Sequence, residues 1–166
     1  MKRIIFTLMI ISFSFIKVSA QIYNLKDYLM YAKMPLDNFA LTLENDINWK
    51  EFPPSQNRID DIRVREIYSF GCKLENNKSQ ILKRSILGNL YSGNRVESTI
   101  LICNDYILLN EIKIDLLKDG FFLKIIDKFK VRFCYQKNKS LIQIQTKSLN
   151  DSLLPEGCYS ISMSQL

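Results

Sequence analysis

The sequence of 166 residues contains no histidine and only five glycines. Without an imidazole, neither a Ser-His-Asp nor a Cys-His triad can be built, because no side chain with an ordinary pKa near neutrality remains to exchange a proton. Histidine-based zinc sites are excluded too, and the four cysteines lie too far apart for CxxC pairs. The glycines form neither GxGxxG nor the phosphate-binding GxxxxGK pattern. We therefore expect no metal ion and no cofactor.

Long apolar runs are missing except at the start of the chain. Lys2 and Arg3 precede an apolar run over residues 4–16, and Val18-Ser19-Ala20 has the small residues of a cleavage site. The run is shorter than the roughly 20 residues that span a bilayer, which argues against the alternative of a membrane anchor. We expect residues 1–20 to be a cleaved signal peptide and the mature chain to be periplasmic or extracellular, with no membrane span.

The length of the remaining chain indicates a single domain, and its net charge is small. Removal of residues 1–20 takes away three basic residues and no acidic one, so the net charge falls from +6 to +3. Residues 21–166 are enough to bury one core without a metal or a dense set of disulfides. The small net charge does not favour nucleic acid as a partner.

Three helices are predicted from apolar spacing and capping residues. Asn24 caps a short helix with Asp27 at its third position. Pro35 opens a second helix over residues 34–47, and Asn104 or Asp105 opens the longest one, which ends before Gly120. The expected buried stripes of the last two helices are Leu36, Phe39, Leu43 and Ile47, and Leu109, Ile112, Leu116 and Leu117.

From Arg65 onward the apolar period changes to two, which indicates strands. The stretch EFPPSQNRIDDIR before it is expected to be a loop, because it contains two prolines and has no periodicity. We predict an α+β fold in which a mostly antiparallel sheet of about seven strands packs against two or three helices. The expected strands cover residues 65–74, 80–91, 96–103, 121–126, 128–136, 141–147 and 158–163.

A weak internal repeat at a shift of 73 residues aligns Leu36 and Phe39 with Leu109 and Ile112. It would divide the single domain of residues 21–166 into two halves, each a helix followed by a meander. Two unrelated amphipathic helices also match in this way by chance.

The strands over residues 128–136 and 141–147 show the clearest alternation in the chain. Their aromatic side chains, such as Phe133 and Tyr135, fall on the inner face. The outer face is polar and basic and is our candidate surface for a protein partner, with a plain solvated face as the alternative. Its residues are Lys128, Lys130, Arg132, Gln143, Gln145 and Lys147.

The four cysteines form an even set, which favours disulfides in an exported chain. Three pairings are open. Alternation places Cys134 and Cys158 on the outer face of their strands, so this pair is the best candidate if the strands are neighbours. Cys72 lies among inward-facing residues and is expected to be a buried thiol.

Carboxylates are the remaining candidates for catalysis, in the form of a histidine-free hydrolase. The acidic residues considered are Asp60, Asp61, Glu66, Glu44 and Asp46. No pattern marks any of them as buried or as facing another carboxylate. We therefore expect these acids to lie on the surface and the protein not to be an enzyme.

Two junctions carry a resemblance: Leu36-Asp37-Asn38-Phe39 running to Asn48-Trp49, and Ile112 running to Asp119-Gly120-Phe121. They resemble the helix ends of small exported bacterial α+β proteins without an assigned function. Periplasmic immunity proteins and secreted inhibitors are of this general kind, so the resemblance implies a non-catalytic protein-binding module. Immunity proteins are strongly acidic, whereas this chain is mildly basic. The alternative function is an envelope or glycan-binding structural component.

Overall fold

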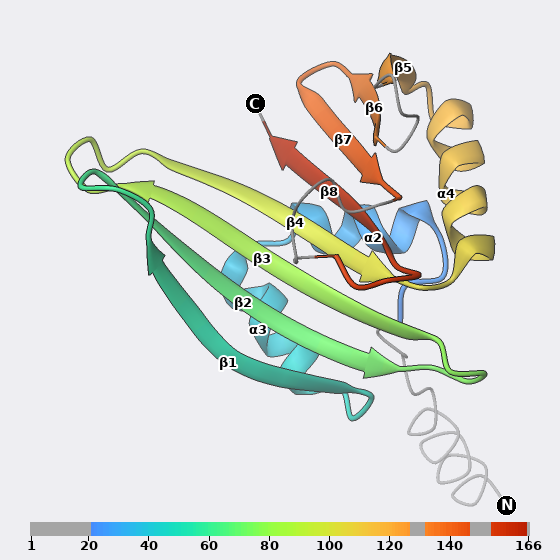
Figure 1. Cartoon of the computed structure of the whole chain (residues 1–166), viewed down its shortest axis with the longest axis horizontal. Helices are drawn as coiled ribbons and strands as arrows, with labels where there is room; N and C mark the ends of the chain where they lie inside the picture. The colour runs from blue at the N-terminus through green and yellow to red at the C-terminus, as the bar shows by residue number, and fades with distance from the viewer. Residues whose placement is uncertain (1–20, 127–131, 147–153, 166) are drawn as a thin grey trace, which may run out of the picture.

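The computed structural model describes residues 21–126, 132–146 and 154–165 (Figure 1). These residues form three helices and one antiparallel sheet of eight strands, which confirms the α+β class. The helices are α2 (Leu25–Lys33), α3 (Leu36–Glu44) and α4 (Tyr106–Lys118). The strands are β1 (Trp49–Arg58), β2 (Arg63–Lys73), β3 (Ser79–Asn89), β4 (Arg95–Cys103), β5 (Phe122–Ile126), β6 (Arg132–Lys137), β7 (Ser140–Gln145) and β8 (Tyr159–Gln165).

The count of about seven strands was wrong because β1 was interpreted as a loop. Pro53 and Pro54 lie where the β1–β2 register shifts, between the paired positions Phe52 and Ser55. Since β1 is an edge strand, it needs ladder hydrogen bonds on one side only, and proline is tolerated there. Every residue of β1 except Trp49 is exposed, so the strand carries no apolar alternation for sequence reasoning to detect.

The sheet consists of two four-stranded meanders joined side by side. Its strand order is β1-β2-β3-β4-β8-β7-β6-β5, so the last strand of each meander lies at the centre. The first meander follows α3 and the second follows α4. This order agrees with the two halves suggested by the weak internal repeat.

One face of the sheet is apolar across both meanders and forms the core with the helices. Phe39 of α3 packs its ring edge against Phe70 of β2, with the ring centroids 5.8 Å apart. The Tyr28 hydroxyl of α2 donates to the Thr99 carbonyl of β4 at 2.9 Å, and Ile112 of α4 is fully buried in the same cluster. Successive partners in one row across six strands are Phe70, Leu82, Leu101, Ile161, Ile144 and Phe133.

The helix predictions were correct at their starts and at the end of α4 before Gly120, whereas the predicted end of α3 was wrong. The Asn24 side chain accepts a hydrogen bond from the Asp27 N–H at 2.9 Å, as expected of the cap. Helix α3 ends at Glu44, so Ile47 lies outside it and is 78 % exposed rather than in the buried stripe. Leu117 is also exposed, because α4 buries Leu108 in its place. No helix in the described ranges is long and apolar enough to cross a membrane.

Candidate functional site

Three of the six residues predicted for the polar face of the 128–147 hairpin lie within the described part of the chain, and all three are half-buried. Arg132 of β6 lies opposite Gln145 of β7, and Gln145 lies opposite Ser160 of β8. Gln143 is in the next row on the same face, opposite Ser162. We name Arg132, Gln143, Gln145, Ser160 and Ser162 the polar sheet face. Lys128, Lys130 and Lys147 lie outside the described residues.

The expected disulfide between Cys134 and Cys158 does not form, and all four cysteines are free thiols. Cys134 is level with Gln143 and therefore with Ser162, and β7 separates its strand from β8. Two strand spacings and four residues along the strand separate the two Cα atoms by roughly 15 Å. A disulfide requires less than about 7 Å. Cys134 lies in β6 as predicted, whereas Cys158 directly precedes β8, and β6 and β8 are not neighbours.

The surroundings of the thiols favour a structural role over a reactive one. Cys72 is buried in the core, as expected, and so is Cys103. Burial raises the pKa of Cys72, Cys103 and Cys158 above the ordinary value of a thiol. Since the thiolate is the nucleophile, these side chains are weak nucleophiles at neutral pH.

Two of the acidic residues considered for catalysis, Asp60 and Asp61, form contacts within the β1–β2 turn. The Asp60 carboxylate accepts hydrogen bonds from the Ile62 N–H at 3.0 Å and the Arg63 N–H at 2.7 Å. A further hydrogen bond from the Arg63 side chain holds the pKa of Asp60 below its usual value. Asp61 pairs with Arg58 at 3.3 Å. Both carboxylates therefore have partners within the turn.

A set of exposed apolar side chains lies where the β1–β2 and β3–β4 hairpins end, at the left of Figure 1. Five large apolar side chains there are between 42 and 82 % exposed, with Tyr91 the most exposed. Isolated exposed apolar residues are ordinary, whereas a gathered set indicates an interaction surface. We call this set the hairpin-end surface. Its residues are Ile59, Ile62, Leu90, Tyr91 and Val96.

Hydrogen bonds hold the backbone that carries the hairpin-end surface. The Leu90 N–H donates to the Ile62 carbonyl at 2.8 Å, which joins the two hairpins at their ends. The Asn89 side chain accepts from the Tyr91 and Ser92 N–H groups, both at 2.9 Å, and Gly93 adopts the positive φ that closes the turn. These hydrogen bonds order the turn in the unbound protein.

Part of this surface was visible in the sequence. The strands predicted over residues 80–91 and 96–103 leave Ser92-Gly93-Asn94 between them, and these residues are typical of a hairpin turn. The β1–β2 end was interpreted as loop, so the meeting of the two ends was missed. That meeting depends on the β2–β3 register, which runs through Arg63 opposite Asn89.

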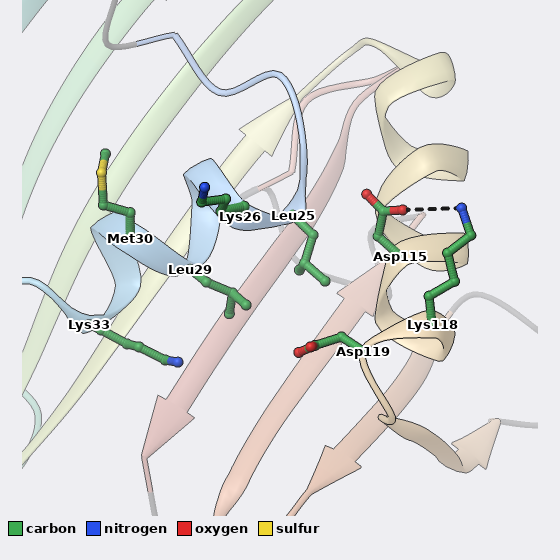
Figure 2. A pocket seen from close by; sticks show the side chains of 8 residues that line it. All are labelled: Leu25, Lys26, Leu29, Met30, Lys33, Asp115, Lys118 and Asp119. Carbon is green, nitrogen blue, oxygen red and sulfur yellow. Dashed lines mark ion pairs between the residues drawn. The ribbon is translucent and has the colours of Figure 1, made fainter.

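A groove of about 690 Å³ separates α2 from α4. Figure 2 shows Leu25 and Leu29 pointing into it, with Lys33 and Asp119 facing it from opposite sides. The carboxylates of α4 and its end have cations nearby, since Asp115 lies 3.7 Å from Lys118 and Asp119 lies 3.3 Å from Lys137. An apolar floor with a charged rim is suited to an apolar side chain of a ligand or partner.

Arg84 of β3 is a buried cation that sequence reasoning did not single out. One guanidinium nitrogen donates to the Tyr31 and Met34 carbonyls, at 2.7 and 2.8 Å, and the other lies 3.4 Å from the Glu97 carboxylate. The guanidinium also lies 4.9 Å from the centroid of the Phe39 ring. These partners cap the C-terminal end of α2, so the role of Arg84 is to hold the helix on the sheet.

Comparison with models of known protein families finds no match to this chain, and neither do comparisons with curated proteins and with solved structures.

Proposed function

We propose that the chain is an exported, non-catalytic protein-binding module, of the kind represented by inhibitors and immunity proteins, and that it binds its partner through the hairpin-end surface. The observation that supports this most is the gathering of Ile59, Ile62, Leu90, Tyr91 and Val96, all strongly exposed, at one end of the sheet.

The residue types support contact with a protein. Binding energy in protein interfaces concentrates in a few large side chains, and tyrosine is among the commonest. Tyr91 stands at the tip and is 82 % exposed. Because the turn below it is already ordered by Asn89 and Gly93, little conformational entropy is lost when a partner orders this surface.

The test is a double variant, Leu90→Ser with Tyr91→Ser, in the mature chain. A partner captured by the wild-type chain and then purified should bind this variant about thirtyfold more weakly, a loss of about 2 kcal/mol, because two central apolar contacts are removed. Titration calorimetry measures the difference. The backbone hydrogen bonds of the turn do not depend on either side chain, so the fold should be unchanged.

Ile47→Ser is the matched control, since Ile47 is equally apolar and equally exposed but lies between α3 and β1. It should leave the affinity unchanged. Equal affinity for all three proteins would reject the hairpin-end surface. Loss of binding in Arg132→Ser with Gln143→Ser would then assign the contact to the polar sheet face.

Export is part of the same proposal. If residues 1–20 are a cleaved signal, the protein recovered outside the cytoplasm begins at Gln21. Intact-mass measurement of the exported protein decides this point. A membrane-bound species that retains Met1 would contradict it and would favour an anchor.

A further inference from the structure

Helix α4 carries large apolar side chains on its outer side as well as on its inner side. Its inner side buries Leu108, Leu109, Ile112 and Leu116 in the core. On the outside, Ile107, Ile114 and Leu117 are 66, 52 and 57 % exposed. These side chains lie among the exposed polar residues Asn110, Glu111 and Lys118, and large apolar side chains gathered on one helix face indicate an interaction surface.

The outward residues follow one line along the helix. Ile107, Glu111, Ile114 and Lys118 are spaced i, i+4, i+7 and i+11, and such positions share one side of a helix. All four are exposed. We call them the outer stripe of α4. Lys113 is not part of it, because its ammonium lies 4.4 Å from the centroid of the Phe133 ring on the sheet.

The outer stripe is complementary to itself when it is turned end to end. Glu111 lies three residues before Ile114, and Lys118 lies four residues after it. If two copies of α4 cross antiparallel with Ile114 near the twofold axis, each Glu111 carboxylate faces the Lys118 ammonium of the other copy, which within its own helix lies 3.7 Å from the Asp115 carboxylate. The apolar side chains then meet between these two ion pairs. A twofold interface requires this kind of self-complementary surface.

We infer that the protein forms a twofold symmetric homodimer through the outer stripe of α4. The hairpin-end surface lies on the other meander, so dimer formation and partner binding use different parts of the molecule. Each dimer therefore presents two copies of the hairpin-end surface. This inference does not depend on the proposed function.

Sedimentation equilibrium of the mature chain, up to millimolar concentration, is the first measurement. The wild-type protein should show a monomer–dimer equilibrium. Ile114→Glu should weaken the dimer by about tenfold or more, because it places two like charges together at the axis. A wild-type chain that stays monomeric at every concentration would overturn the inference.

Charge reversal provides a test that does not depend on the apolar contact. Glu111→Lys alone and Lys118→Glu alone should each weaken the dimer, since each places like charges opposite one another. The double variant should restore the dimer to near the wild-type dissociation constant. Failure of the double variant to recover, with unchanged circular dichroism, would reject the antiparallel arrangement. Ile47→Ser is again the matched control and should dimerise normally.

Discussion

Arg84 shows how one residue fixes the position of a helix on the sheet. The last carbonyls of a helix have no partner inside the helix and favour a cation nearby. At the end of α2, Arg84 is both the hydrogen-bond donor and the cation, since its guanidinium donates to the Tyr31 and Met34 carbonyls. Burial has the largest effect on the pKa of the Arg84 guanidinium and lowers it from the usual value of arginine, while the Glu97 carboxylate raises it.

Replacement of Arg84 by Met keeps much of the side-chain volume but removes the guanidinium donor from the Tyr31 and Met34 carbonyls, of which Tyr31 keeps the Met34 N–H at 3.3 Å. The expected result is a loss of about 2 to 4 kcal/mol in the free energy of unfolding, because buried acceptors without partners are costly. Urea denaturation measures this loss. Glu97→Gln is the control and should cost less than about 1 kcal/mol, since Glu97 is half exposed and surface ion pairs contribute little. Equal losses in the two variants would contradict the capping role.

The cysteines show what residue-level reasoning omits. Alternation along a strand tells on which face of the sheet Cys134 lies. The structure places Cys134 opposite Gln143, on the same face, as predicted. Alternation does not tell which strands are neighbours. The insertion of β7 between β6 and β8 separates Cys134 from Cys158, and only the strand order reveals it.

At the scale of the element, Asp105 combines a cap with an ion pair at the start of α4. Its carboxylate accepts from the Ile107 N–H at 3.1 Å and lies 2.7 Å from the Lys78 ammonium. Burial acts to raise the pKa of Asp105, but the hydrogen bonds from Lys78 and from the helix N–H groups outweigh it, and the pKa is lowered. The charged carboxylate therefore stabilises the folded state.

The pH dependence follows from the lowered pKa of Asp105. Its contribution to the free energy of unfolding is fully present above the ordinary aspartate pKa of about 4, and it is lost as the pH falls through the lower folded-state value. Asp105→Asn keeps an acceptor and loses the charge. Wild type should therefore exceed Asp105→Asn in stability at pH 7, and the difference should vanish in strong acid.

Asp105→Ala separates the cap from the charge. It removes the acceptor as well, and it should cost about 1 to 2 kcal/mol at pH 7. Urea denaturation at neutral and acidic pH gives all three values. A wild-type advantage over Asp105→Asn that persists unchanged in strong acid would show that the ion pair with Lys78 is not its source.

Strands were predictable where one face is buried, because burial produces an alternation of apolar and polar residues in the sequence. Exposed strands carry no such alternation. The alternation of Phe133 and Tyr135 with polar neighbours gave the inner face of β6 correctly, since both pack in or against the core. β1 has no such pattern, because it is exposed beyond Trp49 and interrupted by Pro53 and Pro54. The hairpin-end surface was missed for the same reason, since one of its two turns follows β1.

At the scale of the whole molecule, the class of fold was predictable and the arrangement of the sheet was not. Helix and strand periods in the sequence indicate α+β and antiparallel neighbours. The joining of the two meanders through β4 and β8 depends on pairs such as Leu101 with Ile161. Both residues are apolar and β-forming, but many other strand pairs in this chain satisfy the same description. Sequence pattern alone does not select among them.

The central position of β8 has a consequence for the order of events during synthesis. As the chain leaves the ribosome, β1 to β4 can pair as a local meander, but the free edge of β4 has no neighbour until residues 159–165 emerge. An unpaired apolar edge is a site of aggregation in a folding intermediate. A nascent chain of this protein therefore carries an open β4 edge from the synthesis of Cys103 until the synthesis of Tyr159, about a third of its translation.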